Sequence, residues 1–462
     1  MKKVFHVTIL LIISFKGLAQ QTDTSNRSFV SYLNKTAFEL QVKTYEMGTI
    51  NKNNLTDYYA SGLESSFSIN LKEYKGFSVK ASFDSRVNLA SSDLEKRDSL
   101  ANSSSRYEIG LFNVMAPSQK ISYGIEELYL QYQHKNTSIT WGKMLKQTPF
   151  VNPQDGRLRP TLFEGISLRQ HLTSKLSIDA NWFYKISPRS TDKWFKTEET
   201  IGIYSVGVDA SGNKSAYANN VKSDGLGIFS IQYGLNRNHH FQVWETWIEN
   251  INQTVLFQYD GLWSSNDNKG FITGFQYTFQ STLRDGGNEN PALSYAAPGS
   301  KNNVWSVRIG YKKTNNTATL SFTRISDQGR FLMPREWGHE PFYTFQSRER
   351  NEGLANVSAL MAQYEFNNPQ KKYKVQLSMG SYWLPAVTDF SKNKYGIPSY
   401  YQLNFGTDLN LNKYIRGLQI QTLYAYKGRL DHEVTALKYI HNKVDMHHFD
   451  LILTYRLSQK KH

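Results

Sequence analysis

The segment between residues 141 and 165 holds the residues whose types and spacing point most clearly to binding chemistry. It contains three prolines, which stiffen the chain, and Asp155, Arg157 and Arg159, which place opposite charges side by side. Guanidinium groups bind carboxylates through paired, charge-assisted hydrogen bonds, and a neighbouring carboxylate extends such a site to zwitterions. Asp155, Arg157 and Arg159 are therefore predicted to contact small charged solutes.

A second charged segment lies between residues 335 and 352. Its three arginines, Arg335, Arg348 and Arg350, are interspersed with glutamates. Two interpretations are open. Either these arginines fold inward and help to select among charged solutes, or they form surface ion pairs that stiffen a loop and are individually worth little.

The residue types present exclude several kinds of chemistry. The chain has no cysteine, so disulfides, thiolate metal sites and a lipid-anchored N-terminal cysteine are excluded. The pairs 239–240 and 447–448 are both His-His, but adjacent residues of a strand point to opposite faces and cannot chelate a metal as a unit. The motifs of serine hydrolases, zinc proteases and phosphate-binding loops are missing. We therefore expect no catalytic residue, no metal and no cofactor, and we do not expect an enzyme.

These candidate residues are set among eighteen short stretches in which apolar and polar residues alternate. In one stretch, Val79, Ala81 and Phe83 alternate with Lys80 and Ser82, and the gaps between stretches are alternately short and long. This pattern is typical of an all-β protein, a transmembrane antiparallel β-barrel with short periplasmic turns and long extracellular loops. No stretch approaches the ~18 apolar residues of a transmembrane helix.

The predicted barrel has about 18 strands, although 16 or 20 remain compatible because a long loop could hide or supply a hairpin. The strands are expected at residues 36–47, 60–72, 76–87, 125–133, 137–143, 164–171, 176–186, 225–233, 239–249, 253–263, 270–279, 303–311, 317–325, 357–366, 373–382, 401–409, 417–426 and 447–457. The long loops expected between them include 88–124, 144–162, 187–224 and 326–356.

The N-terminal residues indicate export. Lys2 and Lys3 precede an apolar core at 4–15 and a small-residue cleavage site at 17–19, which is the pattern of a secretory signal peptide. The expected organisation is a signal peptide at 1–19 and a single barrel domain at 20–462. The expected location is the outer membrane of a Gram-negative bacterium.

The charge of the chain favours a lumen that attracts anions. The formal net charge is +15 at pH 7, and no nucleic-acid-binding motif accompanies it, so nucleic acid is not expected as a partner. Along a strand every second side chain faces the lumen. By this alternation, six basic residues face inward on their predicted strands: Lys80, Arg86, Arg169, Lys185, Arg308 and Arg456. Carboxylates could move between such cations if each site binds weakly enough to release them. The alternative is that these residues are merely solvated by the lumen.

The two charged segments carry a resemblance to a known family. Trp141-Gly142, Thr148-Pro149, Asp155, the run 157–161 and Gly165 together resemble the third loop of the OprD family of outer-membrane porins. The segments 333–342 and 348–353 also look like a loop of OprD-like members. The resemblance implies an 18-stranded channel for passive diffusion of small, often carboxylate-bearing solutes, with a ladder of basic side chains in its lumen. It also implies that the third loop folds inward and narrows the channel.

The expected partners are small-molecule solutes, outer-membrane lipid and the barrel-assembly machinery, and the expected state is a monomer or a homotrimer. Two other functions remain open. One is an outer-membrane barrel enzyme of the lipase or protease type, which a Ser/His pair at hydrogen-bond distance near the rim would support. The other is a secreted all-β module that binds polysaccharide.

Overall fold

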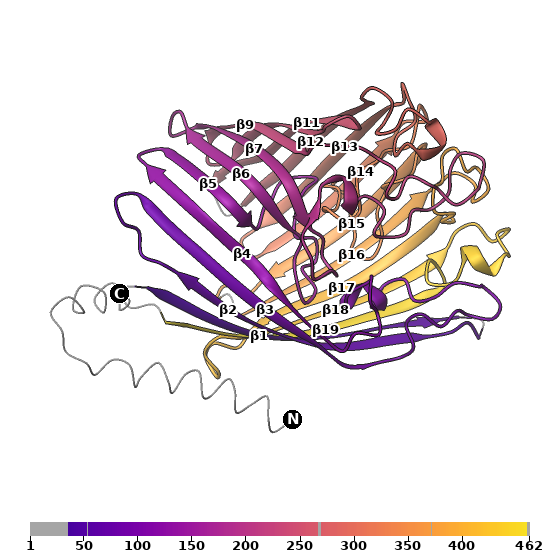
Figure 1. Ribbon diagram of the computed structural model, residues 1–462, viewed down its shortest axis with the longest axis horizontal. Helices are drawn as coiled ribbons and strands as arrows, with labels where there is room; N and C mark the ends of the chain where they lie inside the picture. Colours follow the sequence, from indigo (N-terminus) through magenta and orange to yellow (C-terminus); the bar gives the residue numbers. More distant parts are fainter. Residues whose placement is uncertain (1–35, 53, 267–268, 371, 460–462) are drawn as a thin grey trace.

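Eighteen antiparallel strands close into a barrel in the computed structural model, which describes residues 36–459 except for 53, 267–268 and 371 (Figure 1). Closure is direct, because Val42 of β1 is paired with Ser65 of β2 on one side and with Tyr455 of β19 on the other. The predicted fold and strand number are thereby confirmed. The expected signal peptide at 1–19 lies outside the described residues.

The strands follow the predicted order with modest extensions. They are β1 Ala37–Asn51, β2 Tyr58–Asn70, β3 Phe77–Ser91, β4 Ile121–His134, β5 Thr137–Met144, β6 Leu162–His171, β7 Leu176–Ser187, β9 Leu226–Asn236, β10 His239–Ile248, β11 Asn252–Asn266, β12 Lys269–Thr282, β13 Lys301–Lys313, β14 Asn316–Ile325, β15 Val357–Asn367, β16 Tyr373–Trp383, β17 Tyr400–Asn410, β18 Leu418–Arg429 and β19 Met446–Gln459. The two-residue strand β8, Phe195–Lys196, pairs only with the end of β7, while β7 pairs directly with β9 to continue the wall.

The long connections gather at one end of the barrel and the short turns at the other (Figure 1). We call seven of the long connections the second (92–120), third (145–161), fourth (188–225), sixth (283–300), seventh (326–356), eighth (384–399) and ninth (430–445) loops. Four short 3-10 helices lie in them: η2 Glu108–Leu111, η3 Glu198–Thr200, η4 Pro291–Leu293 and η5 Leu437–Tyr439. Among the described residues, no helix is both long enough and apolar enough to cross a membrane.

The polar face of the strands is their buried face. On β3, Phe83 is 47% exposed on the outer surface, whereas its neighbours Ser82 and Asp84 are 1% and 4% exposed. An apolar outer face is what a membrane requires. The burial of the polar face means that other parts of the chain cover the inner wall.

The long loops cover the inner wall of the barrel. Phe150 of the third loop and Phe331 and Phe342 of the seventh loop contact one another in an apolar cluster that also includes Phe163 and Phe183 of the wall. Burying these aromatic rings stabilises the loops within the barrel by removing apolar surface from water. The third loop therefore lies inside the lumen, as the resemblance implied.

Candidate functional site

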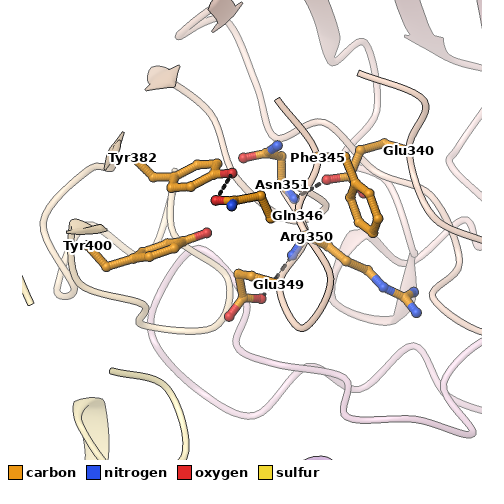
Figure 2. Close-up of a pocket in the computed structure, with 8 residues that line it drawn as sticks. All are labelled: Glu340, Phe345, Gln346, Glu349, Arg350, Asn351, Tyr382 and Tyr400. Atoms are coloured by element: carbon orange, nitrogen blue, oxygen red, sulfur yellow. Dashed lines mark hydrogen bonds between the residues drawn. The ribbon is translucent and has the colours of Figure 1, made fainter. Parts of the chain in front are cut away.

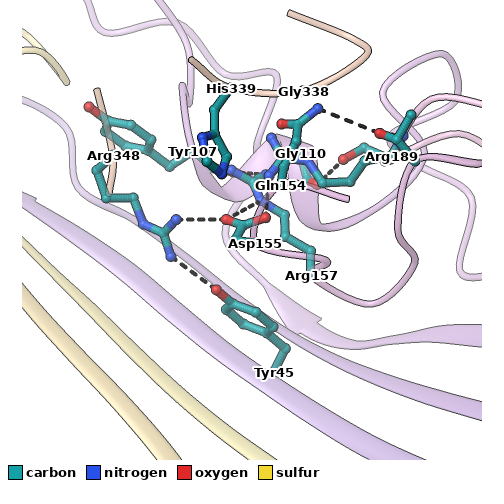
Figure 3. Close-up of polar contacts among 12 residues, drawn as sticks. Tyr45, Tyr107, Gly110, Gln154, Asp155, Arg157, Arg189, Gly338, His339 and Arg348 are labelled. Carbon is teal, nitrogen blue, oxygen red and sulfur yellow. Dashed lines mark hydrogen bonds and ion pairs between the residues drawn. The ribbon is translucent and has the colours of Figure 1, made fainter. Parts of the chain in front are cut away.

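Three loops meet inside the barrel at one carboxylate. Asp155 of the third loop forms ion pairs with Arg157 of the same loop, Arg189 of the fourth loop and Arg348 of the seventh loop (Figure 3). The Oδ2 atom of Asp155 lies 2.7 Å from Nη1 of Arg348 and 3.5 Å from Nε of Arg157. We call Asp155 and these three arginines the arginine cluster.

The arginine cluster holds more positive than negative charge. Burial alone would raise the pKa of Asp155, but the guanidinium groups of Arg189, Arg157 and Arg348 hold it well below its usual range. Asp155 therefore stays ionised and cancels one of three positive charges. Its side chain is 25% exposed, against 4% to 9% for the three arginines, so the carboxylate is the most accessible member of the cluster.

The barrel wall fixes the positions of two of these arginines. Arg157 donates from Nη1 to the carbonyl oxygen of Tyr107 at 2.7 Å, and its own carbonyl oxygen accepts from Nζ of Lys43 on β1 at 2.8 Å. Arg348 donates from Nη2 to the hydroxyl of Tyr45 on β1 at 2.9 Å, and the same nitrogen pairs with Asp450 on β19. The cluster is thus held by β1 and β19 as well as by loops.

Arg159 does not join the cluster with Asp155 and Arg157. Its Nε lies 3.4 Å from Asp84 on β3, and its Nη2 donates to the carbonyl oxygen of Ile125 on β4 at 2.9 Å. Arg86 pairs with the same Asp84 at 2.6 Å and donates to the carbonyl oxygen of Thr191 at 2.8 Å. Both arginines are almost fully buried. They fasten the third and fourth loops to the wall.

The other arginines of the seventh loop support that loop from within. Arg350 donates from Nη1 to the carbonyl oxygens of Arg335 and Gly338, each at 2.8 Å. Arg335 pairs with Glu352 at 2.6 Å and lies over the ring of Tyr395, 3.8 Å from its centroid. These contacts stiffen the seventh loop, as the second interpretation held, but they lie in the interior of the barrel mouth and not on its surface. Of the three arginines predicted here, Arg348 alone reaches the arginine cluster.

Four of the six residues proposed as a basic ladder are neutralised locally. Lys80 pairs with Glu127, Arg86 with Asp84, Arg169 with Asp179 at 2.8 Å and Arg308 with Asp260 at 2.7 Å. Arg456 donates to the amide oxygen of Gln41 at 2.7 Å instead. The lumen therefore presents ion pairs along its wall rather than a row of bare cations. Among these four ion-paired side chains, that of Arg169 has the largest exposed fraction, 51%.

A register shift at the outer end of β7 changes the orientation expected for Lys185. Beyond the pair Gly165–Phe183, the next pair is Glu164–Lys185, so β7 carries one extra residue. Lys185 thus shares a face with Glu164, while the adjacent pair Phe163–Ile186 is buried in the interior apolar cluster. Neighbouring residues of a strand point to opposite faces. The prediction that Lys185 faces the lumen is therefore wrong.

A narrow gap lies between the seventh loop and strands β16 and β17 (Figure 2). Glu340, Glu349, Tyr382 and Tyr400 line it, and Oε2 of Glu340 has no hydrogen-bond partner among the described residues. Burial raises the pKa of Glu340. The gap has no room for a water molecule, whereas ligand pockets measure roughly 300–1,000 Å³, so it is a packing gap beside the loop.

Two members of the site escaped the sequence analysis. Arg189 lies two residues beyond the end of β7, and nothing in its neighbourhood marks it as a partner of a residue 34 positions earlier. Tyr45 left a signal that was overlooked, because it is an aromatic residue with the inward parity of Gln41 and Lys43 on β1. An aromatic on a polar strand face indicates that something packs there.

Comparison with known proteins places this geometry in context. Residues 76–376 match the family described as outer membrane porin, OprD family. Among solved structures, the chain is similar to Pseudomonas aeruginosa OpdK with vanillate, at 13% identity and a TM-score of 0.68, covering 92% of this chain and 100% of that one. It is also similar to Acinetobacter baumannii OccAB2, at 13% identity and a TM-score of 0.70, covering 93% and 100%.

A third similar structure is Pseudomonas aeruginosa OccK9 (OpdG), at 12% identity and a TM-score of 0.69, covering 92% of this chain and 99% of that one. At such identities these likenesses show the fold alone. No curated protein matches the sequence.

Proposed function

This chain belongs to the OprD family of outer-membrane porins, and from that premise we propose that it passes small carboxylate-bearing solutes passively through a lumen narrowed by its third, fourth and seventh loops. The observation that carries the proposal is the convergence of Arg157, Arg189 and Arg348 on the single carboxylate of Asp155. Guanidinium groups remain protonated even when buried. Asp155, together with Asp450 beside Arg348, cancels two of the three positive charges, so the cluster keeps one, which favours anions at the narrow part of the path.

The ion pairs of the wall supply a second part of the proposed path. Arg169 and Arg308 each bind one carboxylate of the wall, and Arg169 is half exposed. A guanidinium group has five N–H donors, more than one carboxylate can use. A solute carboxylate can therefore bind the remaining donors weakly and leave again, as conduction requires. OpdK was crystallised with vanillate, an aromatic carboxylate, which supports this choice of solute class.

The enzyme alternative has one observation in its favour. Oγ of Ser103 in the second loop lies 2.7 Å from Nδ1 of His441 in the ninth loop. Nε2 of His441 lies 3.0 Å from the carbonyl oxygen of Thr56, where a hydrolase would place a carboxylate. The pair therefore lacks the third group of a triad, and we prefer the channel. Ester hydrolysis that is lost in Ser103→Ala would favour the enzyme instead.

Single-channel recording in planar bilayers tests the proposed function. The reversal potential in a salt gradient measures ion preference for the wild type and for Arg348→Gln, with Arg284→Gln as a matched control. Arg284 lies in the exposed sixth loop, 3.7 Å from Glu249, and its removal changes the total charge equally. We expect discrete openings and an anion preference that falls only in Arg348→Gln.

Other outcomes would change the proposal in defined ways. Openings with the same ion preference in all three proteins would remove the arginine cluster from the selectivity mechanism. A correctly folded barrel that does not conduct would contradict the channel itself.

A further inference from the structure

The short turns of the barrel carry a charge that the lumen does not explain. In the first half of the chain, each of the four short hairpins has a basic residue at its tip: Lys75, Lys135, Lys175 and Arg237. All four side chains are exposed. They lie at the end of the barrel opposite the long loops, which in an outer-membrane porin is the periplasmic end.

The second half of the chain repeats the feature. Lys269, Lys313, Lys372 and Lys413 lie in, or next to, the turns of the remaining four short hairpins and are also exposed. Every hairpin at the periplasmic end thus contributes at least one cation, and together they form a ring around the periplasmic rim, which we call the basic ring. Among the described residues of these turns, Glu73 is the one carboxylate.

The long-loop end of the barrel differs in this respect. Its nine connections contain nearly equal numbers of basic and acidic residues. Within the part of the chain that the structure describes, the excess positive charge is therefore concentrated where the strands turn. A concentration of one sign at one end of a protein acts on partners at that end, within about a Debye length of roughly 8–10 Å.

The hairpin tips also expose large apolar side chains beside these cations. Tyr414 is 79% exposed and follows Lys413, whose Nζ lies 6.0 Å from the centre of its ring. Tyr74 is likewise exposed, with Nζ of Lys75 5.5 Å from its ring centre. Tyrosine beside lysine suits the boundary between lipid and water, where the ring meets acyl chains and the cation meets phosphate.

We propose that the basic ring binds the phosphate groups of anionic phospholipids in the periplasmic leaflet of the outer membrane. Charge complementarity favours an anionic partner, and the exposed tyrosines at the same tips favour a lipid surface over a soluble acidic protein. The ring is continuous with the lipid-facing wall, so a headgroup can contact it without any change in the barrel. Each cation close to an anionic surface favours the contact about fivefold.

Lipid association measured by electron spin resonance tests this proposal. The full-length protein is reconstituted in phosphatidylcholine vesicles that contain spin-labelled phosphatidylglycerol or spin-labelled phosphatidylcholine, and the ratio of the two association constants is determined. The ring variant is Lys135→Gln, Lys175→Gln, Lys313→Gln and Lys413→Gln combined. The control combines Lys96→Gln, Lys120→Gln, Lys214→Gln and Lys222→Gln, which removes the same charge from exposed positions of the second and fourth loops.

The expected result is a ratio well above one in the wild type and in the control, which decreases several-fold in the ring variant and with added salt. Lysine-to-arginine changes at the four ring positions should keep the wild-type ratio. Heat-modified migration on a gel shows whether each variant is folded. A wild-type ratio of one would overturn the lipid assignment and favour a soluble acidic partner. An equal loss in the control would show that only total charge matters and would also overturn the proposal.

Discussion

Nη1 of Arg348 lies 2.7 Å from Oδ2 of Asp155, although the two residues are 193 positions apart and belong to different loops. The same guanidinium group reaches Asp450 on the last strand. Arg348 therefore ties the seventh loop, the third loop and the barrel seam together. Because these charges are buried, each is stabilised by the others. Removing one leaves its partners as buried charges without a counter-ion, which lowers the stability of the fold.

Asp155→Asn tests the balance of charge in the arginine cluster. The change removes the one carboxylate that three arginines share, so the surplus positive charge increases. We expect the reversal potential to shift further toward anions. Asp285→Asn removes an equal charge from the exposed sixth loop and should leave the potential unchanged. A shift toward cations in Asp155→Asn would contradict the proposed role of the cluster.

Lys146 of the third loop gives the lumen a pH dependence. Burial lowers its pKa to about 8 from the usual 10.5, although Asp179 acts in the opposite direction. Its Nζ donates to Oγ of Ser167 at 2.6 Å. As the pH rises through about 8, this cation is lost from the folded protein, so the anion preference should decrease. Recordings between pH 7 and about 9.5 test this, and the step should be absent in Lys146→Gln.

The same shift predicts how stability depends on pH. Between about pH 8 and pH 10.5 the unfolded chain keeps the Lys146 proton that the folded protein has released. The unfolded state then binds more protons, so the contribution of this group to stability rises with pH across that range. The difference between the unfolding temperatures of the wild type and of Lys146→Gln in detergent should therefore shift in favour of the wild type as the pH is raised from 8 to about 10.

Arg159 and Arg169 offer a matched comparison of buried and exposed arginines. Arg159→Ala leaves Asp84 with Arg86 alone and removes the donor to the Ile125 carbonyl. Breaking a buried pair from one side costs about 3–5 kcal/mol. Arg169 is half exposed, and although its partner Asp179 is buried, that carboxylate keeps a hydrogen bond from Nε2 of Gln232 at 2.9 Å, so Arg169→Ala should cost less than Arg159→Ala. We expect the gel-shift unfolding temperature to fall clearly in Arg159→Ala and less in Arg169→Ala. Similar losses in both would mean that Arg159 does not anchor the third loop.

The strands were predictable because the lipid on one face of each strand and the lumen on the other select apolar and polar residues in alternation. Val79, Ala81 and Phe83 face lipid and their neighbours face the lumen, so the alternation holds along most of each strand and is interrupted only at register shifts such as the one in β7. The third loop was predictable for a different reason, since its prolines and paired charges are local in sequence. Both kinds of signal need no knowledge of distant residues.

The partners inside the lumen were not predictable in the same way. Asp155 meets Arg189 and Arg348 because three loops fold into one space, and parity says nothing about where a loop goes. The alternation along a strand also indicates which cations face inward, but not which anions lie beside them. Arg308, for example, has inward parity, but Asp260, 48 positions earlier, lies beside it and neutralises it. The sequence therefore indicates which side chains face inward but not which of them remain available to a solute.

The extra residue in β7 leads to the last prediction. Because the register shift places Lys185 on the face of Glu164 and away from the interior cluster, its charge lies on the outer side of the wall. Arg169 lies on the lumen face, paired with Asp179 and half exposed. Lys185→Gln should therefore leave the reversal potential unchanged, whereas Arg169→Gln should lower the anion preference, although the two variants lose the same charge. Recording both in one salt gradient compares them directly. A change in Lys185→Gln as large as that in Arg169→Gln would mean that the alternation continues through the shift and that Lys185 belongs to the lumen after all.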